Sequence, residues 1–376
     1  MKIAFLNNVA YAYARGEKNA VGGSERNIWF HSRALAAAGW SVQIGVRGAL
    51  SPNERKTIEG VEYVGLTNAQ PLISWYRFLS SERPDWLYWA GASHLWGPVV
   101  EIAKLSGVRT VFHTAFDADV QPSRAVFRRS RWWPLYAWGL WRTDNIFVQH
   151  SGQLTMLSPR LQHKARILPK VCPLTPCIKS HLKRQPYVAW VATMRHHKRP
   201  DLLIEIAKRA PSVQFVVCGE PTDYQSPPGY GKRMVEALTQ LQNVKYLGRV
   251  PPDEAMTVIA DAGLLLCTSD EEGFPNTFTQ AWASGTPIVT LKIDPDNIIE
   301  RMGLGAVSKT VEVATNDIQS LVASPQRRED IAGRARRYIS ERHNEAVVVE
   351  IFNNTLGETT SHSTSCDVSL PSRMTE

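Results

Sequence analysis

The chain has 376 residues, 43% of them hydrophobic and 21% charged, which excludes collagen-like and wholly disordered proteins and leaves room for two domains. The formal net charge of +8 is uneven, because residues 1–165 hold 19 Lys and Arg against 11 Asp and Glu, whereas residues 166–376 hold 24 of each. The excess predicts an anionic partner for the first half, whether nucleic acid, lipid headgroups or an anionic substrate.

Short apolar runs alternate with segments of helical periodicity along most of the chain. The runs lie at 3–6, 42–46, 63–66, 86–89, 110–113 and 145–149, and again at 188–192, 213–218, 244–247, 263–267 and 287–291. Between them, segments such as Glu25–Ala38 and Arg199–Arg209 repeat apolar residues every three or four positions. Continuous apolar strands between helices indicate parallel sheets covered on both faces. We therefore predict an α/β protein with two Rossmann-like, doubly wound parallel-sheet domains facing a cleft.

Several classes of segment are missing from the sequence. Five cysteines are too few for a disulfide framework, and Cys172 and Cys177 have no second pair to complete a zinc site. The apolar start at 1–6 is too short for a signal peptide, and no run of 18 apolar residues predicts a spanning helix. We expect reduced thiols and a cytoplasmic setting.

Ligands of parallel sheets bind beyond the carboxyl ends of the strands, so the loops after strands are the places to search. The first such loop leads into Gly22 and Gly23, which allow close approach of the backbone to a ligand, and Ser24 is a candidate helix cap. The loop lacks the Gly-x-Gly-x-x-Gly fingerprint, which argues against a nicotinamide enzyme. A glycine turn without a ligand is the alternative.

Residues 124–142 combine basic and aromatic side chains and contain no acid. The segment holds Arg124, Arg128, Arg129, Arg131 and Arg142 together with Trp132, Trp133, Trp138 and Trp141. Arg and Trp at helical spacing suit a membrane surface, where rings lie at headgroup level, and they would also stack on single-stranded nucleic acid. A helix with inward tryptophans and solvated arginines is the ordinary alternative.

A cationic loop follows the strand at 188–192. Arg195 and Lys198 lie between this strand and a helix that we expect to start near Pro200. Cations at the carboxyl end of a strand suit a diphosphate, although a solvated basic loop is the alternative. The next strand ends in Gly219 and Glu220, at the same edge of the predicted sheet.

The most informative segment is 269–287, after the buried strand 263–267. Gly273 and Pro275 predict a turn, so a helix should begin near Asn276 and offer free N–H groups and a positive dipole end to a phosphate. Glu272 can accept hydrogen bonds from hydroxyls, and Gln280 lies about one helical turn into the helix. A plain strand–turn–helix is the alternative.

This segment resembles the signature of glycosyltransferase family 4, whose members are retaining nucleotide-sugar enzymes with the two-domain GT-B fold. The signature is a Glu followed eight positions later by a second Glu, around a Glu-Gly-Phe-Pro stretch. The resemblance implies that Glu272 contacts the hydroxyls of the donor sugar. Gln280 stands where the second Glu binds the ribose, and it keeps an acceptor oxygen without the charge.

The family also holds the donor diphosphate with an Arg and a Lys five positions later. Lys198 matches the Lys, Thr193 stands at the position of the Arg, and Arg195 follows two positions on. The resemblance further implies that Gly22 and Gly23 contact donor phosphate or acceptor, and that His113 lies against the donor sugar. A packed histidine is the alternative for His113.

These comparisons define the predicted site. We expect catalytic roles for Glu272, Lys198, Arg195 and His113. We expect donor contacts from Gly22, Gly23, Thr193, Gly219, Glu220, Gly273, Phe274, Pro275, Asn276, Thr277 and Gln280. Asp117 and Asp119 form a pair that binds metal in other glycosyltransferase folds, but cations hold the diphosphate in this family, so we assign no metal and no cofactor.

The resemblance also implies a division of the chain. We predict an acceptor-side domain at 1–170, a donor domain at 171–345, a helix at 346–358 that crosses back to the first domain, and a disordered Ser- and Thr-rich tail at 359–376. The predicted join lies in the Pro-rich stretch 168–186.

The expected activity is retaining transfer of a sugar from a nucleoside diphosphate sugar to a glycan, lipid-linked or small-molecule acceptor. A non-catalytic glycan- or lipid-binding protein of the same fold and a nucleotide-sugar epimerase are the alternatives. The basic half then belongs to the acceptor side, so we expect an anionic or lipid-linked acceptor or peripheral contact with the inner face of a membrane through 124–142, and no nucleic acid.

Overall fold

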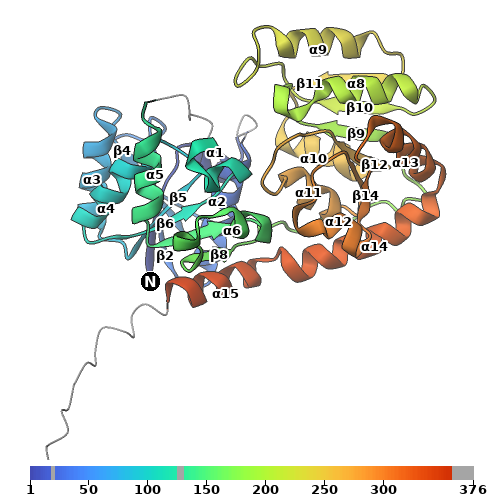
Figure 1. Ribbon diagram of the computed structural model, residues 1–376. Helices are drawn as coiled ribbons and strands as arrows, with labels where there is room; N and C mark the ends of the chain where they lie inside the picture. The colour runs from blue at the N-terminus through green and yellow to red at the C-terminus, as the bar shows by residue number, and fades with distance from the viewer. Residues whose placement is uncertain (18–21, 125–130, 358–376) are drawn as a thin grey trace, which may run out of the picture.

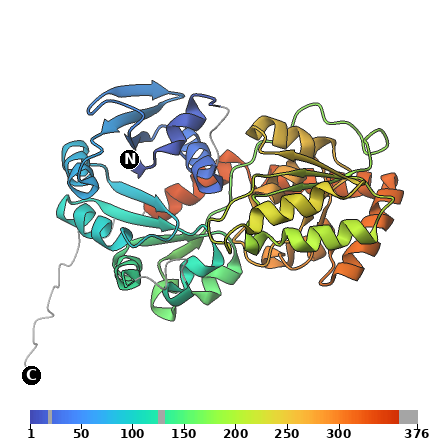
Figure 2. The same ribbon diagram turned by 90° about the horizontal axis from the view of Figure 1, so that it is seen from above.

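A computed structural model describes residues 1–17, 22–124 and 131–357. The chain forms two α/β domains, each built around a mainly parallel sheet, and the predicted fold class is confirmed (Figure 1). Figure 2 shows the two sheets from above, with helices on both faces of each.

The N-terminal domain contains an eight-stranded sheet of order β3-β4-β2-β1-β5-β6-β7-β8 within the described residues. All neighbours pair in parallel except β3 and β4, which are antiparallel. The strands are β1 Lys2–Leu6, β2 Ser41–Arg47, β3 Arg55–Ile58, β4 Val61–Leu66, β5 Trp86–Ala90, β6 Arg109–His113, β7 Asn145–Val148 and β8 Ala165–Ile167. Buried runs such as that of β2 fit a sheet covered on both faces.

Helices bury this sheet through two hydrophobic clusters. One cluster joins the sheet to α1 Val9–Ala14, α2 Gly23–Ala37 and α15 Glu345–Leu356. The other joins it to α3 Pro71–Glu82, α4 Trp96–Leu105 and α5 Trp133–Arg142. Short segments complete the domain, namely the 3-10 turns η1 Asp117–Val120 and η2 Pro122–Arg124 and the helices α6 Ser151–Met156 and α7 Pro159–Gln162.

The C-terminal domain contains a six-stranded parallel sheet of order β11-β10-β9-β12-β13-β14. Its strands are β9 Val188–Val191, β10 Phe215–Cys218, β11 Val244–Gly248, β12 Leu264–Cys267, β13 Ile288–Thr290 and β14 Gly305–Val307. Its helices are α8 Pro200–Arg209, α9 Tyr230–Thr239, α10 Pro252–Asp261, α11 Asn276–Ala283, α12 Ile298–Met302, α13 Val311–Ala323 and α14 Pro325–Arg342, with the 3-10 turns η3 His196–Lys198 and η4 Pro295–Asn297. Two further clusters pack these helices on opposite faces of the sheet.

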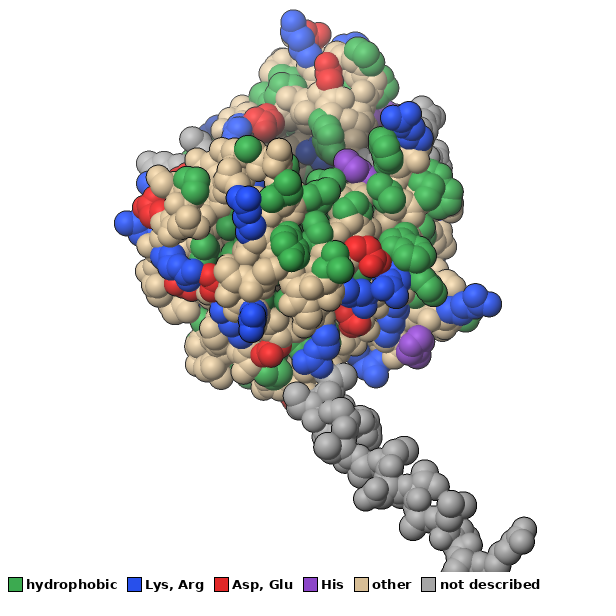
Figure 3. Space-filling model, turned by 90° about the vertical axis from the view of Figure 1, so that its left-hand side faces the viewer, with side chains coloured by type: hydrophobic (Ala, Val, Ile, Leu, Met, Phe, Trp, Pro, Cys, Tyr) green, Lys and Arg blue, Asp and Glu red, His purple; other side chains and the backbone are tan. Residues whose placement is uncertain are grey.

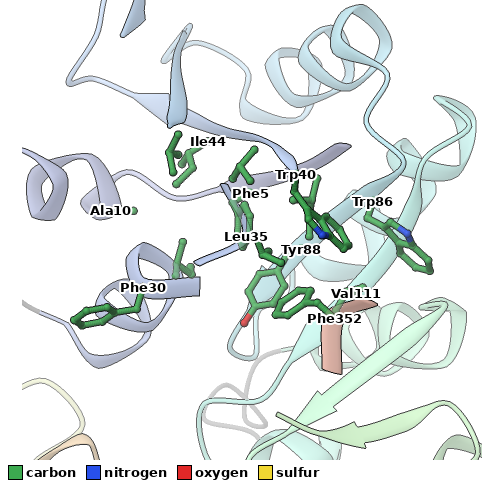
Figure 4. Packing of buried hydrophobic residues seen from close by; sticks show 14 of the residues in the cluster. Phe5, Ala10, Phe30, Leu35, Trp40, Ile44, Trp86, Tyr88, Val111 and Phe352 are labelled. Carbon is green, nitrogen blue, oxygen red and sulfur yellow. The ribbon is translucent and has the colours of Figure 1, made fainter. Parts of the chain in front are cut away.

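The last helix returns to the first domain, as Figure 1 shows along its lower edge. In α15 the Phe352 ring lies 5.0 Å from the Phe147 ring and 6.2 Å from the Tyr88 ring, centroid to centroid. Figure 4 shows Phe352 beside Tyr88. Trp40 Nε1 donates a hydrogen bond of 3.0 Å to Asn353 Oδ1. The end of the described chain is therefore part of the core of the N-terminal domain.

We expect Phe352→Ala to destabilise the N-terminal domain by about 3–5 kcal/mol, because the ring is fully buried and its loss leaves a cavity. Denaturant unfolding followed by tryptophan fluorescence measures this change. Ile73→Ala, at an exposed position on α3, is the matched control and should shift the midpoint little. Equal midpoints for the two variants would show that α15 is not needed for the core.

The structure shows the state of the cysteines and the character of the helices. Cys172, Cys177, Cys218 and Cys267 are free thiols, and within the described ranges no group of His, Cys, Asp and Glu is arranged to hold a metal ion. No helix between residues 1 and 357, as far as they are described, is long and apolar enough to cross a bilayer. The whole tail predicted as disordered, 359–376, lies outside the described residues.

Candidate functional site

A cavity of about 890 Å³ lies between the two domains. It is lined by loops that follow strands of both sheets, including those after β5, β6, β9 and β12, and by the N-terminal ends of α2 and α11. The carboxyl ends of the two sheets thus open onto one space, as expected for ligand sites of parallel sheets. Most of the sequence-predicted site residues are among its lining.

The charged centre of the cavity is an ion pair between Lys198 and Glu272. Lys198 Nζ donates to Glu272 Oε1, and the two side chains are 19% and 10% exposed. Burial alone would raise the pKa of Glu272, but the Lys198 charge and hydrogen bond hold that pKa below its ordinary value. Glu272 is therefore ionised at neutral pH and holds Lys198 in the cavity.

Arg195 and Thr193 line the same wall of the cavity. The Arg195 guanidinium lies 4.9 Å from the centre of the Tyr224 ring, and its Nε is buried without a hydrogen-bond partner among the described residues. A guanidinium held by an aromatic face, with an unused N–H, is suited to bind an anionic oxygen. Thr193 adds no charge.

The N-terminus of α11 supplies the third element of the cavity. The helix begins at Asn276, as predicted, and Pro275 precedes it, so no side chain caps its first N–H groups. Phe274, Pro275, Asn276 and Thr277 all line the cavity. Uncapped N–H groups at a positive dipole end, beside Lys198, form a site suited to phosphate oxygens.

The N-terminus of α2 in the first domain lies beside the N-terminus of α11 in the second. Gly22 has φ +132°, which a residue with a side chain rarely adopts, and a Cβ on Gly23 would lie 2.4 Å from Asn276 Nδ2. Both glycines line the cavity. Glycine is therefore favoured at 22 by its backbone conformation, and a side chain at 23 would have to displace the Asn276 amide of the other domain.

Two hydrogen-bonded contacts join the domains beside the cavity. Gln149 Oε1 accepts from the backbone N–H of Phe274 at 2.6 Å, and Asp296 Oδ1 accepts from the backbone N–H of Ser151 at 2.9 Å. Gly273 fits between them, since a Cβ on it would lie 2.5 Å from Gln149 Oε1. The domains are therefore in direct contact across the loop that carries Glu272.

His113 lies at the carboxyl end of β6 and lines the cavity. Its Nδ1 is hydrogen-bonded to Tyr88 Oη, and its Nε2 is buried without a partner in the described chain. Burial lowers the pKa of His113 well below its ordinary value, so the ring is neutral at pH 7. A neutral imidazole with one unused nitrogen can exchange a hydrogen bond with a bound hydroxyl.

Four predicted donor residues lie outside the lining of this cavity. Gly219 accepts a hydrogen bond from Tyr246 Oη through its carbonyl, Glu220 pairs with Arg249 at 3.3 Å, and Gln280 lies on α11. Gly273 lines a neighbouring cavity of about 560 Å³. The structure therefore groups eleven of the fifteen predicted residues around one space and leaves these four beside it.

The two aspartates of the Asp-x-Asp pair serve the local fold. Asp119 is buried and accepts hydrogen bonds from the backbone N–H groups of Ala115 and Phe116 at 2.7 and 3.1 Å. Asp117 accepts from His150 Nε2 at 2.8 Å and from Gln153 Nε2 at 3.0 Å. The pair is thus engaged within the protein.

Among the lining residues that were not predicted from the sequence, Lys170 and Gln149 make hydrogen bonds across the two domains. Lys170, in the stretch that joins the domains, is 5% exposed and donates from Nζ to Phe274 O and, at 2.7 Å, to Asn276 Oδ1. Gln149 ends the predicted strand 145–149 and contacts both domains. The signal that could have pointed to Lys170 is its place between apolar residues, since Leu168 and Val171 are buried in the structure.

The basic aromatic segment forms an exposed face on the N-terminal domain. Of its arginines, Arg128 and Arg129 lie outside the described residues, whereas Trp133–Arg142 forms α5. Trp132, Trp133, Trp138 and Trp141 are 48%, 38%, 47% and 55% exposed. Figure 3 shows hydrophobic side chains among Lys and Arg side chains on this side of the molecule. The tryptophans therefore face outward, which overturns the alternative of an inward-packed helix.

Comparison with known proteins agrees with this geometry. Residues 178–338 match the family Glycosyl transferases group 1. The chain is 28% identical over 112 residues to the D-inositol 3-phosphate glycosyltransferase of Corynebacterium glutamicum (strain R), a match that spans 28% of this chain and 27% of that protein. It thus covers about a quarter of the length of this relative.

Solved structures match over nearly the whole chain. Sucrose-phosphate synthase from Thermosynechococcus elongatus superposes with a TM-score of 0.74 at 15% identity, over 96% of this chain and 100% of that one. Anabaena HepE in complex with UDP and glucose superposes with a TM-score of 0.70 at 16% identity, over 95% and 100%. The two-domain arrangement is the GT-B fold, and residues 178–338 of its C-terminal half match the group 1 glycosyl transferases.

Proposed function

We propose that this protein is a retaining glycosyltransferase that uses a nucleoside diphosphate sugar. The observation that carries the proposal is the convergence, in one interdomain cavity, of the Lys198–Glu272 pair with the uncapped N-terminus of α11. One arrangement supplies cations for a diphosphate and a carboxylate for sugar hydroxyls. The family match over residues 178–338 supports the same reaction class.

The main catalytic effect in this proposal is electrostatic. Negative charge grows on the diphosphate as it leaves the sugar, and Lys198, Arg195 and the N–H groups of α11 face the place where it would develop. Glu272 holds hydroxyls of the sugar, and the unused nitrogen of His113 contacts the sugar from the opposite domain. In the proposal, the two cationic side chains and the N–H groups of α11 neutralise the leaving diphosphate, and no metal ion is assigned.

The state of the carboxylates supports retention in this proposal. Three carboxylates line the cavity in the described chain, and each is engaged: Glu272 with Lys198, Asp119 with backbone N–H groups, and Glu25 with Ser24 Oγ at 3.0 Å. None is placed as a free base or nucleophile. We therefore propose that the acceptor hydroxyl attacks from the face of the leaving diphosphate, whose oxygens take its proton.

A panel of nucleotide sugars tests the activity. The purified full chain is incubated with UDP- and GDP-sugars, with and without glycan and lipid-linked acceptors, and the released nucleoside diphosphate is measured. We expect release that depends on the acceptor. Release without glycosylated product would instead indicate an epimerase, and absence of both release and nucleotide binding would indicate a non-catalytic protein.

The exposed face on α5 supports a membrane-bound or lipid-linked acceptor. The guanidinium of Arg131 lies 4.7 Å from the Trp132 ring and that of Arg142 lies 5.7 Å from the Trp138 ring, so cations and indoles alternate at the surface. Indoles prefer the headgroup region, and the arginines add attraction for anionic lipid. The net charge of +8 in residues 1–165 adds to this attraction.

We expect the double variant Trp138→Ala and Trp141→Ala to weaken binding to anionic liposomes by at least about tenfold, since each indole buries a large apolar area at the interface. Co-sedimentation with vesicles of phosphatidylglycerol and phosphatidylcholine measures it. The pair Ile73→Ala and Tyr76→Ala, exposed on α3, is the matched control. Unchanged sedimentation of the tryptophan variant would remove α5 as the membrane contact.

A further inference from the structure

We propose that Lys170, in the stretch joining the two domains, binds the diphosphate of the donor and takes up a proton when the donor binds. The inference rests on the proposed function and deepens it by adding a residue that no sequence signature assigns. Lys170 is buried and lines the interdomain cavity.

Lys170 is placed at the site of the phosphates by its hydrogen bonds. Its Nζ donates to Phe274 O and to Asn276 Oδ1, the two residues that flank the start of α11. An ammonium has three N–H donors, and these contacts use two of them. The third donor is not used by these contacts, and Lys170 lines the same cavity as the uncapped start of the helix, so one phosphate oxygen would be able to accept from both.

The charge of Lys170 has no counter-ion in its immediate shell. Its hydrogen-bond acceptors in the described chain are a carbonyl and an amide, and the carboxylate of Glu272 is already bonded to Lys198. A buried ammonium without an anionic partner is costly, and neutralising it by deprotonation is the usual escape. An anion arriving in the cavity supplies the missing partner.

The ionisation state agrees with this geometry. Burial lowers the pKa of Lys170 to about 7, although the nearby charge of Glu272 opposes the shift. The ionisable groups around it are Glu272, Arg26, Lys198, Cys172, His31, His113 and His343. Burial lowers the pKa of all three of these histidines, to about 4 for His31 and His343, so they stay neutral between pH 6.5 and 8.5.

Donor affinity should fall as the pH rises. A bound diphosphate favours the ammonium and raises the pKa of Lys170, so binding takes up a proton from solvent. With the free residue half protonated near pH 7, we expect uptake of about half a proton at that pH and a loss of donor affinity of about 25-fold between pH 6.5 and 8.5. Nucleotide sugars suit this test because their phosphates do not titrate in the range.

Calorimetry of the full chain with UDP-glucose and GDP-mannose, in buffers of different ionisation enthalpy, measures both quantities. Lys170→Met keeps the length of the side chain and removes its charge; we expect more than about 25-fold weaker binding at pH 6.5, no proton uptake and a flat pH profile. Lys179→Met, at an exposed lysine paired with Asp261 at 3.1 Å, is the matched control and should behave as wild type.

The outcomes separate this inference from the proposed function. If wild type binds neither of these nor any other nucleotide sugar of the panel, the proposed function fails. If wild type binds one of them without proton uptake, or Lys170→Met binds it with wild-type affinity and pH profile, the role of Lys170 is overturned and the proposed function stands. If thermal unfolding shows that Lys170→Met does not fold, proton uptake by wild type decides alone.

Discussion

Lys198→Ala is expected to lower donor turnover by about 100- to 1,000-fold, since it removes the central cation facing the leaving diphosphate. Steady-state release of nucleoside diphosphate from the best donor of the panel measures the effect. The loss should appear mainly in kcat, because the charge that Lys198 meets is largest in the transition state.

The matched control for this prediction is Lys208→Ala. Lys208 is exposed in the last turn of α8, the helix whose first turn follows Lys198, so the same substitution removes a cation from the same part of the fold. We expect wild-type turnover for it. Turnover by Lys198→Ala within about twofold of wild type would contradict the assignment of this residue.

Glu272→Gln is expected to lower turnover by about 100-fold. The substitution keeps the size of the side chain, but it removes the charge that holds Lys198 in the cavity and weakens the hydrogen bonds to the donor sugar. Both residues act on one donor. The turnover of the double variant Glu272→Gln and Lys198→Ala should therefore fall by much less than the product of the two single-variant fold losses.

Glu205→Gln, on the exposed side of α8 and paired with Arg209, is the control for the carboxylate change. It should leave turnover unchanged. Strictly multiplicative losses in the double variant would show that Glu272 and Lys198 act independently, against the geometry of the pair.

The strands that carry the site were predictable from sequence because they are buried on both faces. β12, Leu264–Cys267, is entirely buried, and its apolar run is visible as such. β3, Arg55–Ile58, escaped the prediction because it is an antiparallel edge strand with mostly exposed side chains. β8 and β14 were missed because their three residues are mostly exposed or only partly buried, whereas the equally short β13 is wholly buried and apolar enough to be recognised.

The site was predictable where one local segment carries it. The turn and helix start at Gly273 to Asn276 follow from the residue types, and Glu272 and Lys198 follow from the resemblance. Lys170 and Gln149 were not predictable from sequence, because their roles come from contacts with residues more than a hundred positions away. For the same reason no local pattern shows that Gly273 packs against Gln149 of the other domain.

The proposed roles of Lys198 and of the start of α11 depend above all on where the diphosphate lies. A crystal structure of the full chain with UDP or GDP tests this directly. We predict a diphosphate in the interdomain cavity, with its oxygens within hydrogen-bond distance of Lys198 Nζ and of the first backbone N–H groups of α11. A nucleotide bound elsewhere, or with its phosphates directed away from both groups, would contradict the account.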